Sequence, residues 1–361
     1  MSKLRERLAS RPGRQDGLGR LLAAIVVLIV FFSVLYPDTF ATFSNVENVA
    51  RQGATLLVVA IGQAFVLLVG GFDISVGATM GFASTAAALV MKDGGLLAGL
   101  AVGLLCGVGV GFVNGVFIAK LKINPFVMTL AMFTFLGGLA NELSDGASVF
   151  GLPDDFALFG KDDWGPIPST VGIAAITLLV GWLLLTRTRI GLYLYAIGGS
   201  RDTSTLAGVR VDRYEILAYT LCGALAGLAG LMLASRVQVG QAGLGSGFEL
   251  LSIAAAVIGG VAIGGGTGRI LGVVLGVVLL SVISTGMNIA GWSEFIQQMV
   301  TGGVLVIAVL VSVRRGARFR LRDWFRVRAE RSSLRPDARG VGQGPDVTTA
   351  ANRAAREKES E

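Results

Sequence analysis

One acidic residue, Asp73, stands in a glycine-bearing run inside a long apolar part of the sequence. An ionised carboxylate costs several kcal/mol in hydrocarbon, so an intramembrane acid usually faces a cavity, pairs with another group or caps a broken helix. Asp73 and Ser75 are good helix N-cap residues, and Gly70 and Gly71 allow a tight turn before them. The run therefore predicts an interrupted or re-entrant helix. Asp73 either caps the following helix, the reading we favour, or forms a polar element at a gate.

A second polar segment, residues 187–215, separates two apolar stretches and is rich in arginine. Its middle predicts a short helix that Ser200 or Asp202 can cap. Leu206 offers this helix an apolar contact, and Gly208 is placed to end it in the left-handed conformation. Such a helix suits the docking of a soluble partner. Alternatively, the segment is an ordinary basic loop on the cytoplasmic side of a membrane.

Several kinds of chemistry are excluded by what the sequence lacks. The chain has no histidine, which removes Ser/His and Cys/His pairs, histidine proton relays and most transition-metal sites. The glycine-rich runs at 243–247 and 264–269 lack the Gly-Lys-Ser/Thr ending of a phosphate loop. We therefore expect neither catalysis nor ATP binding by this chain itself.

The composition is that of a polytopic membrane protein. Hydrophobic residues make up 53% of the 361 residues, charged residues 15%, and mean hydropathy is +0.70, which is rare in soluble chains. The fold class we expect is all-α, an inner-membrane bundle of about ten transmembrane helices with interrupted or re-entrant segments. The expected spans are 21–36, 54–69, 74–91, 96–119, 126–143, 169–186, 216–235, 250–263, 270–290 and 295–313.

The distribution of lysine and arginine predicts the orientation. With the N-terminus inside, these spans return the C-terminus inside, and only Arg51, Lys92, Lys161 and Arg236 of the 31 basic residues lie outside. The net charge of +7 is then explained by topology and anionic lipid rather than by nucleic acid. We expect a multi-pass protein of the bacterial cytoplasmic (inner) membrane with both termini in the cytoplasm.

Four regions follow from this pattern. Residues 1–20 form a basic cytoplasmic tail, and residues 21–313 form the transmembrane domain. We expect the first span to stay uncleaved, because a 20-residue basic tail precedes it and no small-residue cleavage site follows it. Residues 314–331 are basic with interleaved aromatics and suit a helix on the membrane surface. Residues 332–361 are poor in hydrophobic residues and predict a disordered cytoplasmic tail.

Glycines recur every fourth position from Gly99 to Gly115 and again at Gly223 and Gly227. This spacing places small residues on one helix face, where another backbone can approach closely. We interpret these faces as helix contacts rather than as a solute path.

Four motifs occur in order along the chain: Gly71-Phe72-Asp73-Ile74-Ser75-Val76-Gly77, Asn124-Pro125-Phe126-Val127-Met128-Thr129-Leu130, Tyr195-Ala196-Ile197-Gly198-Gly199, and Ala254-Ala255-Ala256-Val257-Ile258-Gly259-Gly260 before Gly264-Gly265-Gly266-Thr267-Gly268. Together they resemble the ribose/xylose-type permeases of ATP-binding-cassette (ABC) importers, over residues 54–312. Four motifs in register are far more specific than any one of them.

The resemblance implies partners for this chain. They are a second permease copy (a homodimer or a close paralogue), a cytoplasmic ABC ATPase, an extracytoplasmic sugar-binding protein and the lipid bilayer. No cofactor is expected on this chain, since ATP and Mg would lie on the partner ATPase. The short helix then looks like the element that couples to the ATPase, through Ser200, Arg201, Asp202, Leu206, Ala207, Gly208, Arg210 and Arg213, the arginines being available for acidic partners. Thr203, Ser204 and Thr205 depart from the alanine-rich sequence common in the family and lower its helix propensity.

The same resemblance implies that the chain forms a monosaccharide path, opened alternately to each side as the two permease copies rock. Sugar hydroxyls need partners when they leave water, so amides and hydroxyls in or beside the spans are candidates. Each is at least as able to bond a neighbouring helix. The candidates are Gln63, Asp73, Ser75, Asn114, Asn124, Thr129, Asn141, Asn288 and Gln297, with Thr134 and Gln298 as further members.

Alternatives remain at this point. A permease of the same superfamily for branched-chain amino acids or a signalling furanone would have the same architecture. An ion-coupled secondary transporter also uses broken helices, but usually needs more membrane acids or a histidine. The acidic loop after Glu142, residues 144–168, either steers a basic lobe of the binding protein or is acidic because positive charge is kept inside.

Overall fold

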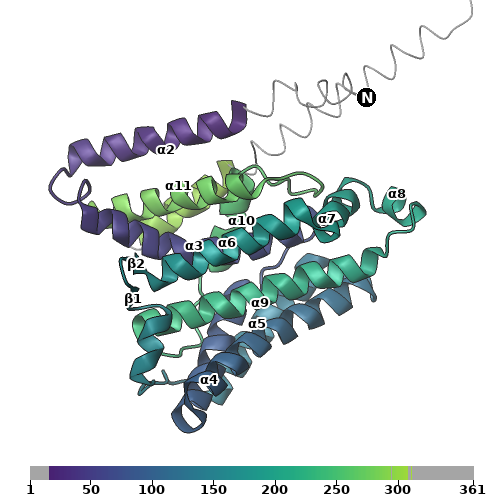
Figure 1. Ribbon diagram of the computed structural model, residues 1–361, viewed down its shortest axis with the longest axis horizontal. Helices are drawn as coiled ribbons and strands as arrows, with labels where there is room; N and C mark the ends of the chain where they lie inside the picture. Colours follow the sequence, from purple (N-terminus) through teal and green to yellow (C-terminus); the bar gives the residue numbers. More distant parts are fainter. Residues whose placement is uncertain (1–15, 294, 308–309, 311–361) are drawn as a thin grey trace, which may run out of the picture. The chain divides into compact units, whose positions relative to one another are not determined.

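Figure 1 shows the computed structural model of the chain, which describes residues 16–293, 295–307 and 310. The described residues belong to one compact unit. Most of the basic N-terminal tail, the surface segment 314–331 and the C-terminal tail 332–361 lie outside the described residues.

The described chain is mostly helical and contains seven helices that are long and apolar enough to cross a membrane: α2, α3, α4, α5, α6, α9 and α11. The polytopic helical membrane class is therefore confirmed. The elements in order are α2 (Asp16–Leu35), α3 (Phe43–Leu68), α4 (Val76–Ala119), α5 (Pro125–Leu143), η1 (Asp154–Phe159), β1 (Asp163–Trp164), β2 (Ile167–Pro168), α6 (Ser169–Arg187), α7 (Arg189–Gly199), α8 (Arg201–Leu206), α9 (Val211–Val237), α10 (Phe248–Ile258) and α11 (Ile270–Ile289). A further apolar helix spans Phe295–Ile307.

The helix α4 is folded into two antiparallel arms. Its 44 residues contain one non-helical position, Gly95, at φ 78° and ψ 174°. A Cβ on Gly103 would lie 3.1 Å from the Cβ of Ala87, whereas 16 residues of straight helix span about 24 Å. The break falls between the two predicted spans 74–91 and 96–119, because only glycine adopts this φ without strain.

The helix α10 is shorter than the predicted span 250–263. Its 11 residues cover about 16 Å, roughly half of a hydrocarbon core. Gly260, at φ 89°, ends it, and residues 238–247 before it are not regular helix. The predicted short helix in the segment 187–215 is present as α8, but a second helix, α7, precedes it and was not predicted.

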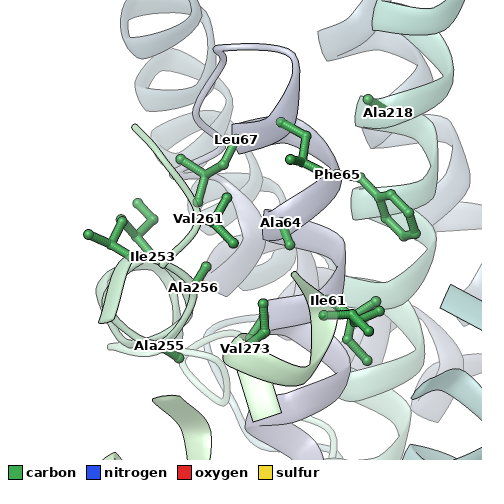
Figure 2. Close-up of a cluster of buried hydrophobic side chains, with 14 of the residues drawn as sticks. Ile61, Ala64, Phe65, Leu67, Ala218, Ile253, Ala255, Ala256, Val261 and Val273 are labelled. Atoms are coloured by element: carbon green, nitrogen blue, oxygen red, sulfur yellow. The ribbon is translucent and has the colours of Figure 1, made fainter. Parts of the chain in front are cut away.

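The core is built around α3, which packs against α6, α9, α10 and α11. Figure 2 shows the cluster in which Ile61, Ala64 and Phe65 of α3 lie with side chains of α9, α10 and α11. The most extensive contact between two helices is that of α4 with α9 (Figure 1). Here Gly107 and Gly223 face each other, and a Cβ on either would collide with the other's carbonyl oxygen. The glycine face is thus a helix contact, as predicted.

These contacts give a prediction with a matched control on the same helix. Gly107→Val should destabilise the fold by roughly 1–3 kcal/mol or more, because the backbone of α9 must move away. Gly109→Val should change stability little, because a Cβ at Gly109 meets nothing within 4 Å. Thermal unfolding of the two variants in detergent checks this, and equal melting temperatures would contradict the packing.

Candidate functional site

The chain between α3 and α4 forms a short irregular segment, residues 69–75, inside the bundle. Gly70 turns the chain at φ 82°, and the Gly71 N–H then donates to the carbonyl oxygen of Val66 (3.0 Å). The side-chain amide of Gln63 bonds both backbone groups of Asp73, at 3.1 and 3.2 Å, in the amide orientation that satisfies both partners. The backbone of the break is therefore held partly by backbone bonds to the end of α3 and partly by the side chain of Gln63, which satisfies polar groups that no regular helix pairs.

The carboxylate of Asp73 bonds within this segment. Its Oδ1 accepts from the backbone N–H of Ser75 (2.9 Å) and from the Ser75 hydroxyl (2.6 Å). Asn114, on the second arm of α4, donates its Nδ2 to the same hydroxyl (2.9 Å). Gln63, Asp73, Ser75 and Asn114 are each no more than 1% exposed. These four predicted path residues therefore meet in one buried network, and Asp73 makes the local bonds of a cap.

One member of this network was missed by the sequence reasoning. Tyr219 of α9 is fully buried, and its hydroxyl donates to the carbonyl oxygen of Phe72 (3.1 Å). A tyrosine inside an apolar span needs a partner for its O–H. This requirement is the sequence signal that could have identified Tyr219, although it does not specify which group accepts the hydrogen bond.

The network predicts different effects for two substitutions of Asp73. Asp73→Asn keeps an oxygen for the Ser75 donors and should retain most transport. Asp73→Leu leaves both donors buried without an acceptor and should lower solute uptake by about tenfold or more. Uptake by membrane vesicles measures both. Equal loss in the two variants would show that the charge itself is needed.

The other predicted path residues do not join this network. Asn124, Thr129 and Asn141 lie on or beside α5, where each bonds locally to a backbone group within four residues. Asn288 accepts from the side-chain amide of Gln297 (2.7 Å) at the far end of α11. Thr134 likewise bonds its own helix, and Gln298 is exposed.

The predicted coupling segment presents an exposed tip. Ser200 caps α8 by accepting from the N–H of Thr203 (3.3 Å). Leu206, at the end of α8, is 90% exposed, and Gly208 follows it at φ 79°. Asp202, Ala207, Arg210 and Arg213 are also exposed.

Arg201 has a different environment from the one expected. Instead of being free for an acidic partner, its guanidinium forms a two-pronged ion pair with Glu215 of α9, with Nη1 to Oε1 at 3.1 Å. Glu215 is only 5% exposed and lies one helical turn before Tyr219. The pair therefore connects α8 to the helix that holds the break at Phe72.

The helix α7 packs against two places where the chain reverses direction: the end of α3 and residues 259–269. Gly198 packs on the backbone of Leu68 and of Gly266 so closely that a Cβ would not fit. The Gly266 N–H donates to the carbonyl oxygen of Leu68 (2.9 Å), and the Tyr195 hydroxyl donates to that of Gly268 (3.1 Å). The end of α3, α7 and residues 259–269 thus form one end of the bundle.

At the opposite end, Arg51 of α3 bonds Glu47 and Asp163 and donates to the carbonyl oxygen of Lys161. These bonds connect the acidic loop, residues 144–168, which includes β1, to α3. Among the described residues, no group of three or more His, Cys, Asp or Glu side chains is arranged to hold a metal ion.

Comparison with known proteins identifies relatives of the whole unit. Residues 45–309 match the family described as "Branched-chain amino acid transport system / permease component". The ribose import permease protein RbsC of Bacillus subtilis strain 168 is 38% identical over 308 residues, which cover 84% of this chain and 95% of the relative. The L-arabinose transport system permease protein AraH of Escherichia coli K12 is 39% identical, covering 80% and 88%. The D-allose transport system permease protein AlsC of the same strain is 32% identical, covering 79% and 88%. No solved structure matches the chain.

Proposed function

Because the chain belongs to the family of branched-chain amino acid transport system permease components, we propose that it is the membrane-spanning permease subunit of an ABC importer. Its solute is a monosaccharide delivered by an extracytoplasmic binding protein. One observation carries the solute class: relatives aligned over about four fifths of the chain are named for ribose, arabinose and allose. A branched-chain amino acid is the second candidate solute, because the family description names that class of solute.

The proposed topology has ten membrane crossings with both termini in the cytoplasm. The two arms of α4 count as two crossings, and the short helices α10 and Phe295–Ile307 supply two more. Lys120, Lys122 and Arg269 flank the same end of the bundle as α7 and α8, which supports a cytoplasmic position for that end. Arg51 and the acidic loop then face the outside.

The proposed partner at the cytoplasmic end is an ABC ATPase that receives α8. The exposed Leu206 and the basic residues around it supply an apolar anchor with a charged rim, as docking surfaces usually do. ATP and Mg would bind to that partner, and this chain would catalyse no reaction. A second permease copy would complete the path, and the acidic loop would receive the binding protein.

Uptake in cells tests the solute class. The chain is expressed with its ATPase and binding protein in a host that lacks ribose, arabinose and allose uptake. We expect accumulation of at least one radiolabelled monosaccharide, and competition by that sugar but not by leucine. Accumulation of leucine instead would contradict the sugar assignment and support the second candidate.

A further inference from the structure

The chain between α9 and α10, residues 238–247, runs through the bundle as an irregular segment beside the first arm of α4. Gly240 lies against Ala88 and the carbonyl oxygen of Ser84, and the Ser84 hydroxyl donates to the carbonyl oxygen of Gln241 (3.2 Å). Further along, Gly245 meets the backbone of Gly77. Successive residues of the segment therefore follow α4 from position 88 to position 77, which is about 16 Å along a helix.

This path places Glu249 inside the membrane-embedded part of the bundle. The segment follows the first arm of α4 for about 16 Å before it reaches Gly77, and Glu249 lies beside Gly77 in the first turn of α10. From there α10 continues for about 15 Å to Gly259. An acid within the membrane-embedded part of a protein normally has a function.

The carboxylate of Glu249 uses only one of its oxygens. Oε1 accepts from the N–H of Gly247 (3.1 Å), whereas Oε2 has no hydrogen-bond partner in the part of the chain that the structure describes. Oε2 lies against Gly77, where a Cβ would not fit. Oε2 is covered in this conformation, and an unpaired buried acceptor is unfavourable, so a small movement of the side chain that brings this oxygen to a donor is favoured.

The same segment carries an open polar face. Gln241, Gly243 and Ser246 are exposed, and Leu250 beside Glu249 is 48% exposed. Irregular backbone at this depth does not face lipid, since only protein or a water-filled cavity can satisfy its polar groups. The exposed side of residues 241–249 must therefore meet one of these two.

We propose that residues 241–249 line a water-filled path and that Glu249, with Ser246 and Gln241, binds the hydroxyl groups of the solute within the membrane. This inference rests on the proposed function for the identity of the solute. A carboxylate accepts from two hydroxyls at once, while the amide and hydroxyl both donate and accept, which matches a polyol. Gly243 and Gly247 lie between them, and a Cβ on either would meet no atom closer than 4.0 Å, so the backbone there is accessible to a sugar ring. The buried network at Asp73 would then shape the break rather than touch the solute.

Thiol labelling tests whether water reaches the exposed side of residues 241–249. In the full transporter, with Cys106 and Cys222 replaced by alanine, Ser246→Cys is treated with a charged, membrane-impermeant methanethiosulfonate. Val180→Cys is the control, because Val180 is 49% exposed on the apolar helix α6, where lipid is expected. We expect Ser246→Cys to react at least about tenfold faster. Equally slow reaction at both positions would overturn the proposal and show that protein, such as a second copy, covers the face.

Two substitutions test the role of Glu249. Glu249→Gln keeps an oxygen for the Gly247 N–H, so the local backbone is held, but it loses the charged acceptor. We expect the KM for uptake to rise about tenfold, with labelling at Ser246→Cys unchanged. Glu249→Ala should raise the KM further. Uptake by Glu249→Gln with an unchanged KM would overturn the role of Glu249. Fast labelling without any sugar uptake would instead count against the proposed solute, because the labelling does not depend on its identity.

Discussion

Leu206→Asp should abolish stable binding of the ATPase while leaving the permease folded in the membrane. Leu206 is 90% exposed at the end of α8, and an apolar side chain of this kind is stabilised only when a partner covers it. A carboxylate there would be desolvated on docking without a designated partner, which typically costs enough to weaken binding more than tenfold. Co-purification of the ATPase on a tagged permease measures the effect.

The control is Leu121→Asp, because Leu121 is also exposed, at 61%, and lies at the predicted cytoplasmic end between Lys120 and Lys122. It should leave co-purification unchanged.

A second control separates the effect of the backbone conformation after α8 from the effect of the Leu206 side chain. Gly208→Ala should weaken docking because Gly208 lies at φ 79°, where a Cβ is strained, whereas Gly199→Ala meets nothing within 4 Å and has an ordinary φ. Normal co-purification of Leu206→Asp would remove α8 as the docking element.

Reversing either charge of the pair between Arg201 and Glu215 should uncouple transport from a bound ATPase. Glu215 is nearly buried, and removing the partner of a buried charge is strongly destabilising. Because Glu215 lies one turn before Tyr219, a shift of this part of α9 changes the bond from Tyr219 to Phe72 and so the break beside Asp73. We expect uptake to fall more than tenfold for Arg201→Glu and for Glu215→Arg, and to recover substantially in the double variant.

A second ion pair at the same end of the bundle supplies the control. Lys122 and Asp212 also join α9 to a neighbouring segment, with Nζ to Oδ1 at 2.7 Å, but both side chains are more than half exposed. Surface pairs contribute little, so Lys122→Glu and Asp212→Lys should change uptake less than about twofold. Equal loss at the two pairs, or a double variant of Arg201 and Glu215 that stays inactive, would refute a specific link through Glu215.

The parts of the fold that the sequence predicted well depend on local chemistry. The break around Asp73 follows from glycines next to two N-cap residues, and the α4 contact face follows from glycines at every fourth position. The short helix α8 follows from Ser200 and Gly208 at its two ends. In each case residues within a few positions of one another determine the structure.

The parts that were missed depend on residues distant in the sequence. Glu215 lies in a basic segment, and its role becomes visible only from its ion pair with Arg201. Tyr219 bonds the carbonyl oxygen of Phe72, a residue of the break between α3 and α4. Glu249 lies one position before the predicted span 250–263 and therefore counted as loop. The polar residues of α5 were good candidates by type, yet Thr129 and Asn141 bond carbonyl oxygens four residues earlier in the chain, an option open to any such residue in a helix.

The energy source is the most direct test of the central proposal. The purified chain, with its ATPase and binding protein, is reconstituted into proteoliposomes with the sugar identified by uptake in cells, and accumulation is measured with ATP or with an imposed proton or sodium gradient. We expect accumulation with hydrolysable ATP only when both partners are present, and none with either gradient alone. Gradient-driven accumulation by the chain without its partners would contradict it and identify a secondary transporter.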